Sequence, residues 1–252
     1  MQQSIYDQNR YFMKDSIRKT IDFSKADQNL AVPPPPIEKP HSTDKEQIPL
    51  VPSTDFLDLY EIKLLSAINE RKSRRQFKQD PISLTELSFL LWATQGIKEF
   101  IDDGHALRTV PSTGARHALE TYLAVLNVGS LATGFYRYLP VSHSIVVEKL
   151  NNSAREQIVS AAFSQSWMAD AAVILVWSAV PYRMEWRYGL AAHRVILIDV
   201  GHACQNLYLA CEAIGAGTCA VGAYDQEKMD QVLGLDGNDE FVIYMAPVGR
   251  PL

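Results

Sequence analysis

A cluster of basic side chains at residues 71–78 is the part of the sequence whose residue types most clearly suggest chemistry. The segment reads Arg-Lys-Ser-Arg-Arg-Gln-Phe-Lys, and five of its eight residues are cationic in a chain with a formal net charge of -5. In an extended backbone, Arg71, Ser73 and Arg75 would point to one side. Two guanidinium groups around a hydroxyl suit a terminal phosphate. A solvated helix end that complements the helix dipole is the alternative interpretation.

Two further segments combine small residues with possible ligand contacts. Residues 108–117 read Arg-Thr-Val-Pro-Ser-Thr-Gly-Ala-Arg-His and precede a predicted strand. Backbone N–H groups in such a loop can approach a ligand closely, although the pattern also suits an ordinary turn. Residues 215–223 lack the GxGxxG pattern and follow a helix, so they do not form a Rossmann phosphate loop. Gly222 is expected at a strand end, where a flat ring could pack against the backbone.

Three polar residues, Asp199, His202 and Asn206, share one face of a predicted apolar helix at 194–214. A histidine in this setting is usually a core or interface group. The sequence has no HExxH pattern or comparable ligand spacing, so we expect no metal site. It has no GxSxG motif either, which argues against a serine hydrolase.

The elements that must position these residues follow from apolar periodicity and from breaker residues. Helices are predicted at 57–69, 84–96, 152–164, 194–214 and 226–233. Strands are predicted at 121–128, 134–138, 144–148, 171–180, 218–223 and 240–248. Ser83 and Glu86 form a capping-box pattern before the second helix, Gly96 is its expected stop, and a loop is expected up to Pro111. Alternating helices and strands indicate an α/β or α+β layered domain.

The N-terminal part of the chain, residues 1–56, differs in composition from the remainder. It contains Pro33 to Pro36 in succession and then Pro40, Pro49 and Pro52. Such a segment is locally extended and cannot form a helix or a central strand. We expect a proline-rich arm or strap, draped over a neighbouring subunit; a disordered linker is equally compatible. Residues 57–252 are expected to form the main domain.

Composition excludes several classes of protein. A net acidic chain of 252 residues argues against general nucleic-acid binding. No apolar run reaches the ~18 residues of a membrane span, and the N-terminus lacks a secretory core, so we expect a cytosolic protein without a membrane partner. The cysteines contain no CxxC pair, and we expect them to be small buried residues: Cys204, Cys211 and Cys219.

Taken together, these segments resemble the nitroreductase superfamily of FMN flavoproteins, and most closely its SagB/ThcOx-type dehydrogenase branch. The resemblance covers nearly the whole chain, in the expected order. It rests on residues 71–77, 91–96 (Leu-Trp-Ala-Thr-Gln-Gly), 111–116 (Pro-Ser-Thr-Gly-Ala-Arg), 199–207 and 215–218, and on 9–12 and 14–20 in the arm.

The resemblance implies an α+β fold with a mixed central sheet flanked by helices. It also implies an intertwined homodimer that binds two FMN molecules at its interface. Arg71, Ser73 and Arg75 would hold the FMN phosphate and ribityl chain, and Lys72 would reach the N1–O2 side of the ring. Many nitroreductases have a basic residue well beyond the last strand that also contacts the phosphate; in this sequence we expect Arg250 to take that role.

The resemblance also assigns the surroundings of the flavin ring. Three residues of the partner subunit would border it: Pro111, Ser112 and Thr113. The backbone of three others would face the N5 edge, where a donor stabilises the reduced ring: Val221, Gly222 and Ala223.

The activity implied is ping-pong hydride transfer through N5, to or from a small molecule or a peptide. NAD(P)H is the expected reductant of a nitro or quinone reductase, whereas an azoline-oxidising relative uses FMN as hydride acceptor. Three side chains are candidates for a general acid or base: Tyr182, Tyr188 and His202. The alternative is a non-catalytic, flavin-binding scaffold subunit of a peptide-modifying complex.

Overall fold

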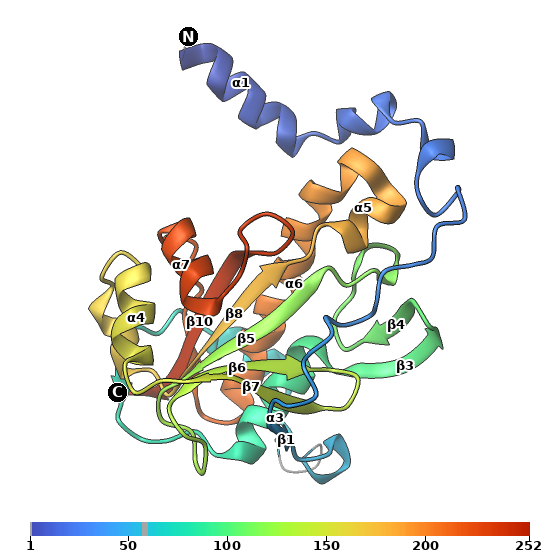
Figure 1. Ribbon diagram of the computed structural model, residues 1–252. Coiled ribbons are helices and arrows are strands. Elements are labelled where there is room, and N and C mark those ends of the chain that lie inside the picture. The colour runs from blue at the N-terminus through green and yellow to red at the C-terminus, as the bar shows by residue number, and fades with distance from the viewer. Residues whose placement is uncertain (1, 57–59) are drawn as a thin grey trace.

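The computed structural model describes residues 2–56 and 60–252, which build one central sheet with helices on both faces (Figure 1). Its strand order is β1-β7-β6-β5-β8-β10-β2, and β9 pairs with β10. In chain order the strands are β1 Gln47–Pro49, β2 Phe77–Lys78, β5 Leu119–Val125, β6 Gly134–Leu139, β7 Ser144–Leu150, β8 Val173–Ala179, β9 Gly217–Thr218 and β10 Phe241–Pro251. The predicted α+β class is confirmed.

Pairing in this sheet is mostly antiparallel. Every named strand pair runs antiparallel. Parallel pairing among the described residues is limited to two isolated bridges, Ser73 with Thr218 and Ile82 with Val128. The sheet is therefore mostly antiparallel, and its parallel pairing is confined to these bridges.

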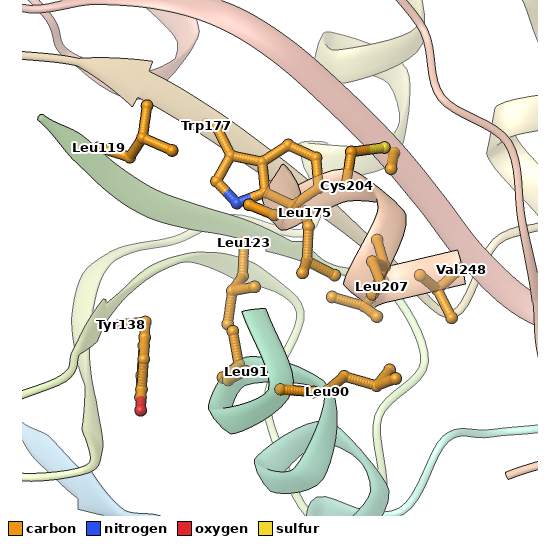
Figure 2. Close-up of a cluster of buried hydrophobic side chains, with 14 of the residues drawn as sticks. Leu90, Leu91, Leu119, Leu123, Tyr138, Leu175, Trp177, Cys204, Leu207 and Val248 are labelled. Carbon is orange, nitrogen blue, oxygen red and sulfur yellow. The ribbon is translucent and has the colours of Figure 1, made fainter. Parts of the chain in front are cut away.

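Strand β8 lies in the interior of the sheet, as its apolar run predicts, and its side chains alternate between two cores. Leu175 and Trp177 belong to the core on one face, whereas Ile174 and Val176 belong to the core on the other. The first core contains residues of α3 (Leu84–Gln95) and α6 (Ala192–Ala213), some of which Figure 2 shows beside Trp177. Residues of α4 (Ala154–Ala161) and α7 (Gln226–Leu233) belong to the second core.

Local sequence signals explain the ends of several helices. Ser83 Oγ accepts from the N–H of Glu86, whose carboxylate accepts from the N–H of Ser83, so the predicted capping box of α3 is confirmed. The remaining helices are α1 Gln2–Met13, α2 Leu64–Glu70 and α5 Tyr182–Tyr188. Short 3₁₀ turns span Asp15–Thr20, Phe23–Lys25, Ser53–Asp55, Thr113–Ala115, Ser166–Asp170 and Gly189–Ala191. No helix in the described ranges has both the length and the apolar character to cross a membrane.

Three predicted elements differ in the structure. Helix α2 begins only at Leu64; positions 57–59 of the predicted helix lie outside the described residues. The expected loop after Gly96 is an antiparallel hairpin of β3 (Ile97–Asp102) and β4 (His105–Arg108). The predicted strand 218–223 is reduced to β9 and a single bridge between Val221 and Met245.

The proline-rich segment packs as a strap across its own subunit before it joins the sheet as β1 (Figure 1). Buried charged side chains bind its backbone. Arg137 donates to the carbonyl oxygens of Lys39 and Pro40, and Glu120 accepts from the N–H of Lys39 at 2.7 Å. Arg137 and Glu120 also form a buried ion pair. The structure therefore favours the strap over the disordered linker.

Candidate functional site

The basic cluster leaves α2 in an extended conformation, as predicted. Ser73 forms a parallel bridge with Thr218, and the N–H of Arg74 donates to the Thr218 carbonyl at 2.9 Å. Alternate residues of an extended chain face opposite sides. Arg74 packs on Gly217, where an added Cβ would lie 2.4 Å from its Cδ. Arg71, Ser73 and Arg75 therefore face the side of the extended segment opposite Arg74.

The charges of the cluster are unequally compensated. Arg74 pairs with Glu212 at 3.5 Å. In the described part of the chain, no carboxylate lies within 4.0 Å of the basic groups of Arg71, Lys72 or Arg75. The guanidinium groups of Arg71 and Arg75 are thus available to an external anion.

Tyr208 on α6 is a contact of this cluster that sequence reasoning missed. Its hydroxyl lies 2.9 Å from Ser73 Oγ and accepts from the N–H of Ala220 at 2.8 Å. The guanidinium carbon of Arg71 lies 5.3 Å from the centre of its ring, within the range of cation–π attraction. Because α6 is apolar nearly all round, only the hydroxyl marks this position in the sequence.

A second group of predicted site residues forms a tight turn held by Asp199. The carboxylate accepts from Ser112 Oγ at 2.7 Å and from the N–H of Thr113 at 3.1 Å. Burial raises the pKa of Asp199, and the hydrogen bonds from Ser112 and Thr113 oppose this shift. Gly114 has a φ of 61°, and a Cβ there would lie 2.3 Å from the hydroxyl of Tyr188. The turn therefore depends on glycine and has a fixed shape.

Helix α6 connects the turn to the basic cluster. Asp199 contacts the turn and Tyr208 contacts the cluster. Nine residues of α-helix separate the two, a rise of about 14 Å. The contribution of Pro111, Ser112 and Thr113 to a partner's site stays a prediction, because one protomer is described.

Among residues 221–223, only Val221 pairs with the sheet, through a single bridge to Met245. Val221 exchanges backbone hydrogen bonds with Met245 at 2.8 and 3.2 Å. Gly222 and Ala223 are exposed, and a Cβ on Gly222 would meet only Tyr244 Cε2, at 3.8 Å. Within the described ranges, the N–H groups of Gly222 and Ala223 donate to no protein acceptor. These two donors are free to bind a ligand.

The three acid–base candidates and Arg250 have surroundings unlike those of the basic cluster. Tyr182 donates to Asp27 of the strap at 2.7 Å, and this bond raises its pKa. Tyr188 packs on the turn at Gly114, and His202 is exposed on α6. Arg250 donates to the Ile214 carbonyl at 2.6 Å and to Glu86 at 2.5 Å, so its fork is already engaged within the protein.

The cysteines are unpaired and buried, as expected. Burial raises the pKa of Cys204 to about 12. A thiol with so high a pKa is a poor nucleophile at neutral pH.

Comparison with known proteins identifies relatives of this chain. The model of the Nitroreductase family matches residues 68–250. MJ1384 of Methanocaldococcus jannaschii, named provisionally as a nitroreductase, is 34% identical over 195 residues, covering 77% of this chain and 94% of that protein. The trifolitoxin-processing protein TfxB of Rhizobium leguminosarum bv. trifolii is 25% identical over 226 residues. That match covers 86% of this chain but only 60% of TfxB.

Solved structures show the same fold. A protein of Ralstonia eutropha JMP134, also named provisionally as a nitroreductase, superimposes with a TM-score of 0.69 at 26% identity, covering 87% of this chain and 99% of that one. A chain of the E. coli microcin synthetase McbBCD complex with truncated pro-MccB17 bound gives a TM-score of 0.61 at 19% identity, with 85% of each chain covered. The expected nitroreductase-like fold is confirmed.

Proposed function

Because the chain belongs to the nitroreductase family, we propose that it is an FMN-dependent oxidoreductase that acts as a homodimer. The single observation that carries the proposal is the extended basic cluster. It presents two guanidinium groups and a hydroxyl on one side, and in the described part of the chain neither guanidinium has a carboxylate partner. This is the donor set that a phosphate monoester requires.

The residues present fit the cofactor at both of its ends. Arg71, Ser73 and Arg75 would hold the phosphate and ribityl chain, with Lys72 toward the ring. Tyr208 would orient Ser73 and stack beside Arg71. At the other end, the free N–H groups of Gly222 and Ala223 would donate to the ring edge, where Gly222 offers no side chain to block the approach. Arg250 would have to leave Glu86 to reach a phosphate, so the proposal does not depend on it.

The chain's own groups would bind and orient, and none need act as a nucleophile. When bound, FMN supplies a hydride donor and acceptor at N5. A backbone donor beside that position favours the reduced, anionic ring. The turn at Ser112 and Thr113, fixed by Asp199, would border the partner's ring and limit the access of water. Among the acid–base candidates, His202 is exposed on α6, whereas Tyr182 is hydrogen-bonded to Asp27.

A non-catalytic scaffold within a peptide-modifying assembly is the second candidate. The similarity to TfxB, whose name describes it as a processing protein, favours this alternative and the SagB/ThcOx branch. The exposed apolar side chains of α1 also favour a macromolecular partner: Ile5, Tyr6, Tyr11 and Phe12. Under this alternative FMN would bind, but hydride transfer would be absent.

The decisive experiment is the absorbance spectrum of the purified protein, with the mass of any small molecule released on denaturation. We expect a flavin spectrum and the mass of FMN. Anaerobic NADH or NADPH should bleach the flavin, and a nitroarene or quinone should restore its colour. A yellow protein that no reductant or acceptor changes would support the scaffold instead.

The double variant Arg71→Ala/Arg75→Ala tests the phosphate assignment. We expect it to lose most of its FMN, because each charged hydrogen bond contributes roughly 1.5–3 kcal/mol. The matched control is Lys149→Ala/Arg155→Ala, which removes two positive charges on β7 and α4. Equal FMN content in the two variants would refute the assignment.

A further inference from the structure

Two arginines, neither of them ion-paired within the described part of the chain, lie where the turn at Gly114 meets α5. Arg116 follows the turn and Arg187 belongs to the helix. A Cβ on Gly114 would lie 3.3 Å from Arg187 Nη1, and the guanidinium carbon of Arg116 lies 4.6 Å from the ring centre of Trp186, the residue before Arg187. The turn and the helix thus hold both guanidinium groups in one neighbourhood. We name Arg116 and Arg187 the arginine pair.

Arg187 has its hydrogen-bonding groups free. The side chain is half-buried, and its guanidinium carbon lies 5.4 Å from the ring centre of Tyr188, within the range of cation–π attraction. In the described part of the chain, none of its nitrogens donates to an acceptor, and none is among the nitrogens that are enclosed without a partner. The aromatic contact therefore positions a guanidinium group whose N–H donors are open to an external acceptor.

Arg116 is buried but keeps one nitrogen open. Only 3% of it is exposed; its Nε donates to the Arg183 carbonyl and its Nη1 to the Gly104 carbonyl, each at 2.9 Å. Nη1 also lies 2.9 Å from His105 Nε2. Its Nη2 has no acceptor among the described residues and is not among the nitrogens that are enclosed without a partner. The bonds to the two carbonyl oxygens fix the guanidinium group, and Nη2 can donate to a ligand.

The electrostatics of the arginine pair favour an anion. No carboxylate of the described residues lies within 4.0 Å of either guanidinium group. Burial, followed by the charge of Arg187, lowers the pKa of Arg116, so the two groups are close enough to disfavour each other's charge. Three carboxylates of the surrounding elements are already bound: Asp199 by Ser112 and Thr113, Asp102 by His105, and Glu185 by His193. Two close positive charges without a paired counter-charge attract an anion.

We propose that Arg116 and Arg187 bind the phosphate group of a phosphate monoester. Guanidinium groups bind phosphate oxygens through parallel hydrogen bonds, and both members of the pair have donors to spare. A monoester carries a charge of about −1.5 to −2 at neutral pH, which offsets two arginines, whereas a carboxylate or a sulfate ester offsets only one. The site is separate from the basic cluster, because the length of α6 between Asp199 and Tyr208 lies between them.

This inference deepens the proposed function and rests on it in one respect. Ser112 and Thr113 are proposed to border the partner's flavin, and Gly114, the next residue, lies against Tyr188 and Arg187. A phosphate bound by the arginine pair would therefore lie beside the redox centre. This makes a phosphorylated molecule the substrate class, either the dinucleotide reductant or the molecule that exchanges a hydride with the flavin. Binding of the phosphate itself requires no flavin and can be measured separately.

The test is isothermal titration calorimetry of the chain carrying Arg71→Ala/Arg75→Ala, in which the basic cluster can no longer hold a phosphate. We expect phenyl phosphate to bind about tenfold more tightly than phenyl sulfate, which has a similar shape and a single negative charge. Arg187→Gln in this background should weaken phenyl phosphate about tenfold, as for the loss of a charged hydrogen bond. Arg187→Lys should weaken it less, because lysine keeps the charge but lacks the planar fork.

Arg155→Gln is the matched control in the same background. Arg155 lies on α4, is also half-buried, and has no ion pair among the described residues. Replacing it should leave the affinity for phenyl phosphate unchanged. The test uses Arg187 because its side chain makes no hydrogen bond within the described structure, whereas a change at Arg116 would also break two bonds to carbonyl oxygens.

NADP⁺ and NAD⁺ in the same assay identify the source of the phosphate. NADP⁺ carries a phosphate monoester that NAD⁺ lacks. Tighter binding of NADP⁺ that depends on Arg187 would assign the site to the dinucleotide reductant. Equal binding of the two, beside tight binding of phenyl phosphate, would assign it to a phosphorylated substrate.

Equal affinities for phenyl phosphate and phenyl sulfate, or an unchanged affinity in Arg187→Gln, would overturn the inference. A complete loss of phenyl phosphate binding in Arg71→Ala/Arg75→Ala itself would do the same, because all binding would then belong to the basic cluster. A colourless parent protein in which phenyl phosphate binding depends on Arg187 would refute the proposed cofactor but not the arginine pair. A yellow parent protein whose phosphate binding does not depend on Arg187 would refute only the arginine pair.

Discussion

The hydroxyl of Tyr208 lies 2.9 Å from Ser73 Oγ, although 135 residues separate the two in the chain. The same hydroxyl accepts from the N–H of Ala220, two residues before Gly222. One side chain thus connects the basic cluster with the segment that leads to the proposed ring contacts. A change at Tyr208 should therefore affect both ends of the site.

Replacing Tyr208 by phenylalanine tests this connection. Tyr208→Phe retains the ring beneath Arg71 but leaves Ser73 Oγ and the Ala220 N–H without their shared partner. We expect FMN to bind about fivefold more weakly and the free energy of unfolding to fall by about 1–2 kcal/mol. Fluorescence titration with FMN and urea unfolding measure the two effects.

Tyr136→Phe is the matched control. The Tyr136 hydroxyl donates to the Ala132 carbonyl at 2.7 Å, away from the basic cluster. This variant should lose comparable stability and bind FMN as the parent does. If both variants bound FMN equally well, Tyr208 would have no part in cofactor binding.

The backbone at Gly222 offers a test that separates folding from binding. A Cβ there would meet only Tyr244 Cε2, at 3.8 Å, and the residue is exposed. Gly222→Val should therefore change the free energy of unfolding by no more than about 0.5 kcal/mol. If a flat ring packs against this backbone, the same side chain should weaken FMN binding at least tenfold. Normal FMN affinity in a stable Gly222→Val protein would place the ring elsewhere.

The attachment of the strap should weaken in acid. Burial alone would raise the pKa of Glu148, but hydrogen bonds from Lys45 and Arg137 outweigh it, so the pKa is lowered below the usual value of 4.5. Such a carboxylate stabilises the fold above the unfolded-state pKa, and this contribution is lost as the pH falls through the folded-state pKa. The stabilisation is therefore complete well above pH 4.5 and declines below it.

Urea unfolding of the parent and of Glu148→Gln between pH 6 and pH 3 measures this contribution. We expect the parent to be more stable at pH 6 and the difference to shrink steadily below pH 4.5. Glu227→Gln is the control, since Glu227 is exposed on α7 and makes no ion pair in the described part of the chain. A difference for Glu148→Gln that does not vary with pH would contradict the assignment.

Where the structure departs from the sequence predictions, the cause lies in distant contacts or in an overlooked turn signal. The β3–β4 hairpin was predicted as a loop because its segment is rich in Asp, Gly and His. In the structure β3 is exposed along nearly its whole length, so no buried apolar face marks it as a strand. The dipeptide Asp103-Gly104 at the tip of the hairpin is common in two-residue hairpin turns and could have identified it, although neither residue has the positive φ of a type I′ turn. Tyr208 had no such signal, since its partner Ser73 lies 135 residues away in the sequence.

The sequence alone determined what depends on near neighbours. The capping box at Ser83, the alternation of β8 between two cores, and the extended basic cluster after α2 all follow from local propensity and from side-chain spacing. Tertiary structure decided which distant groups meet. Tyr208 reaches Ser73, and buried Arg137 and Glu120 bind the strap at Lys39, because a buried polar group must find a partner wherever the fold provides one.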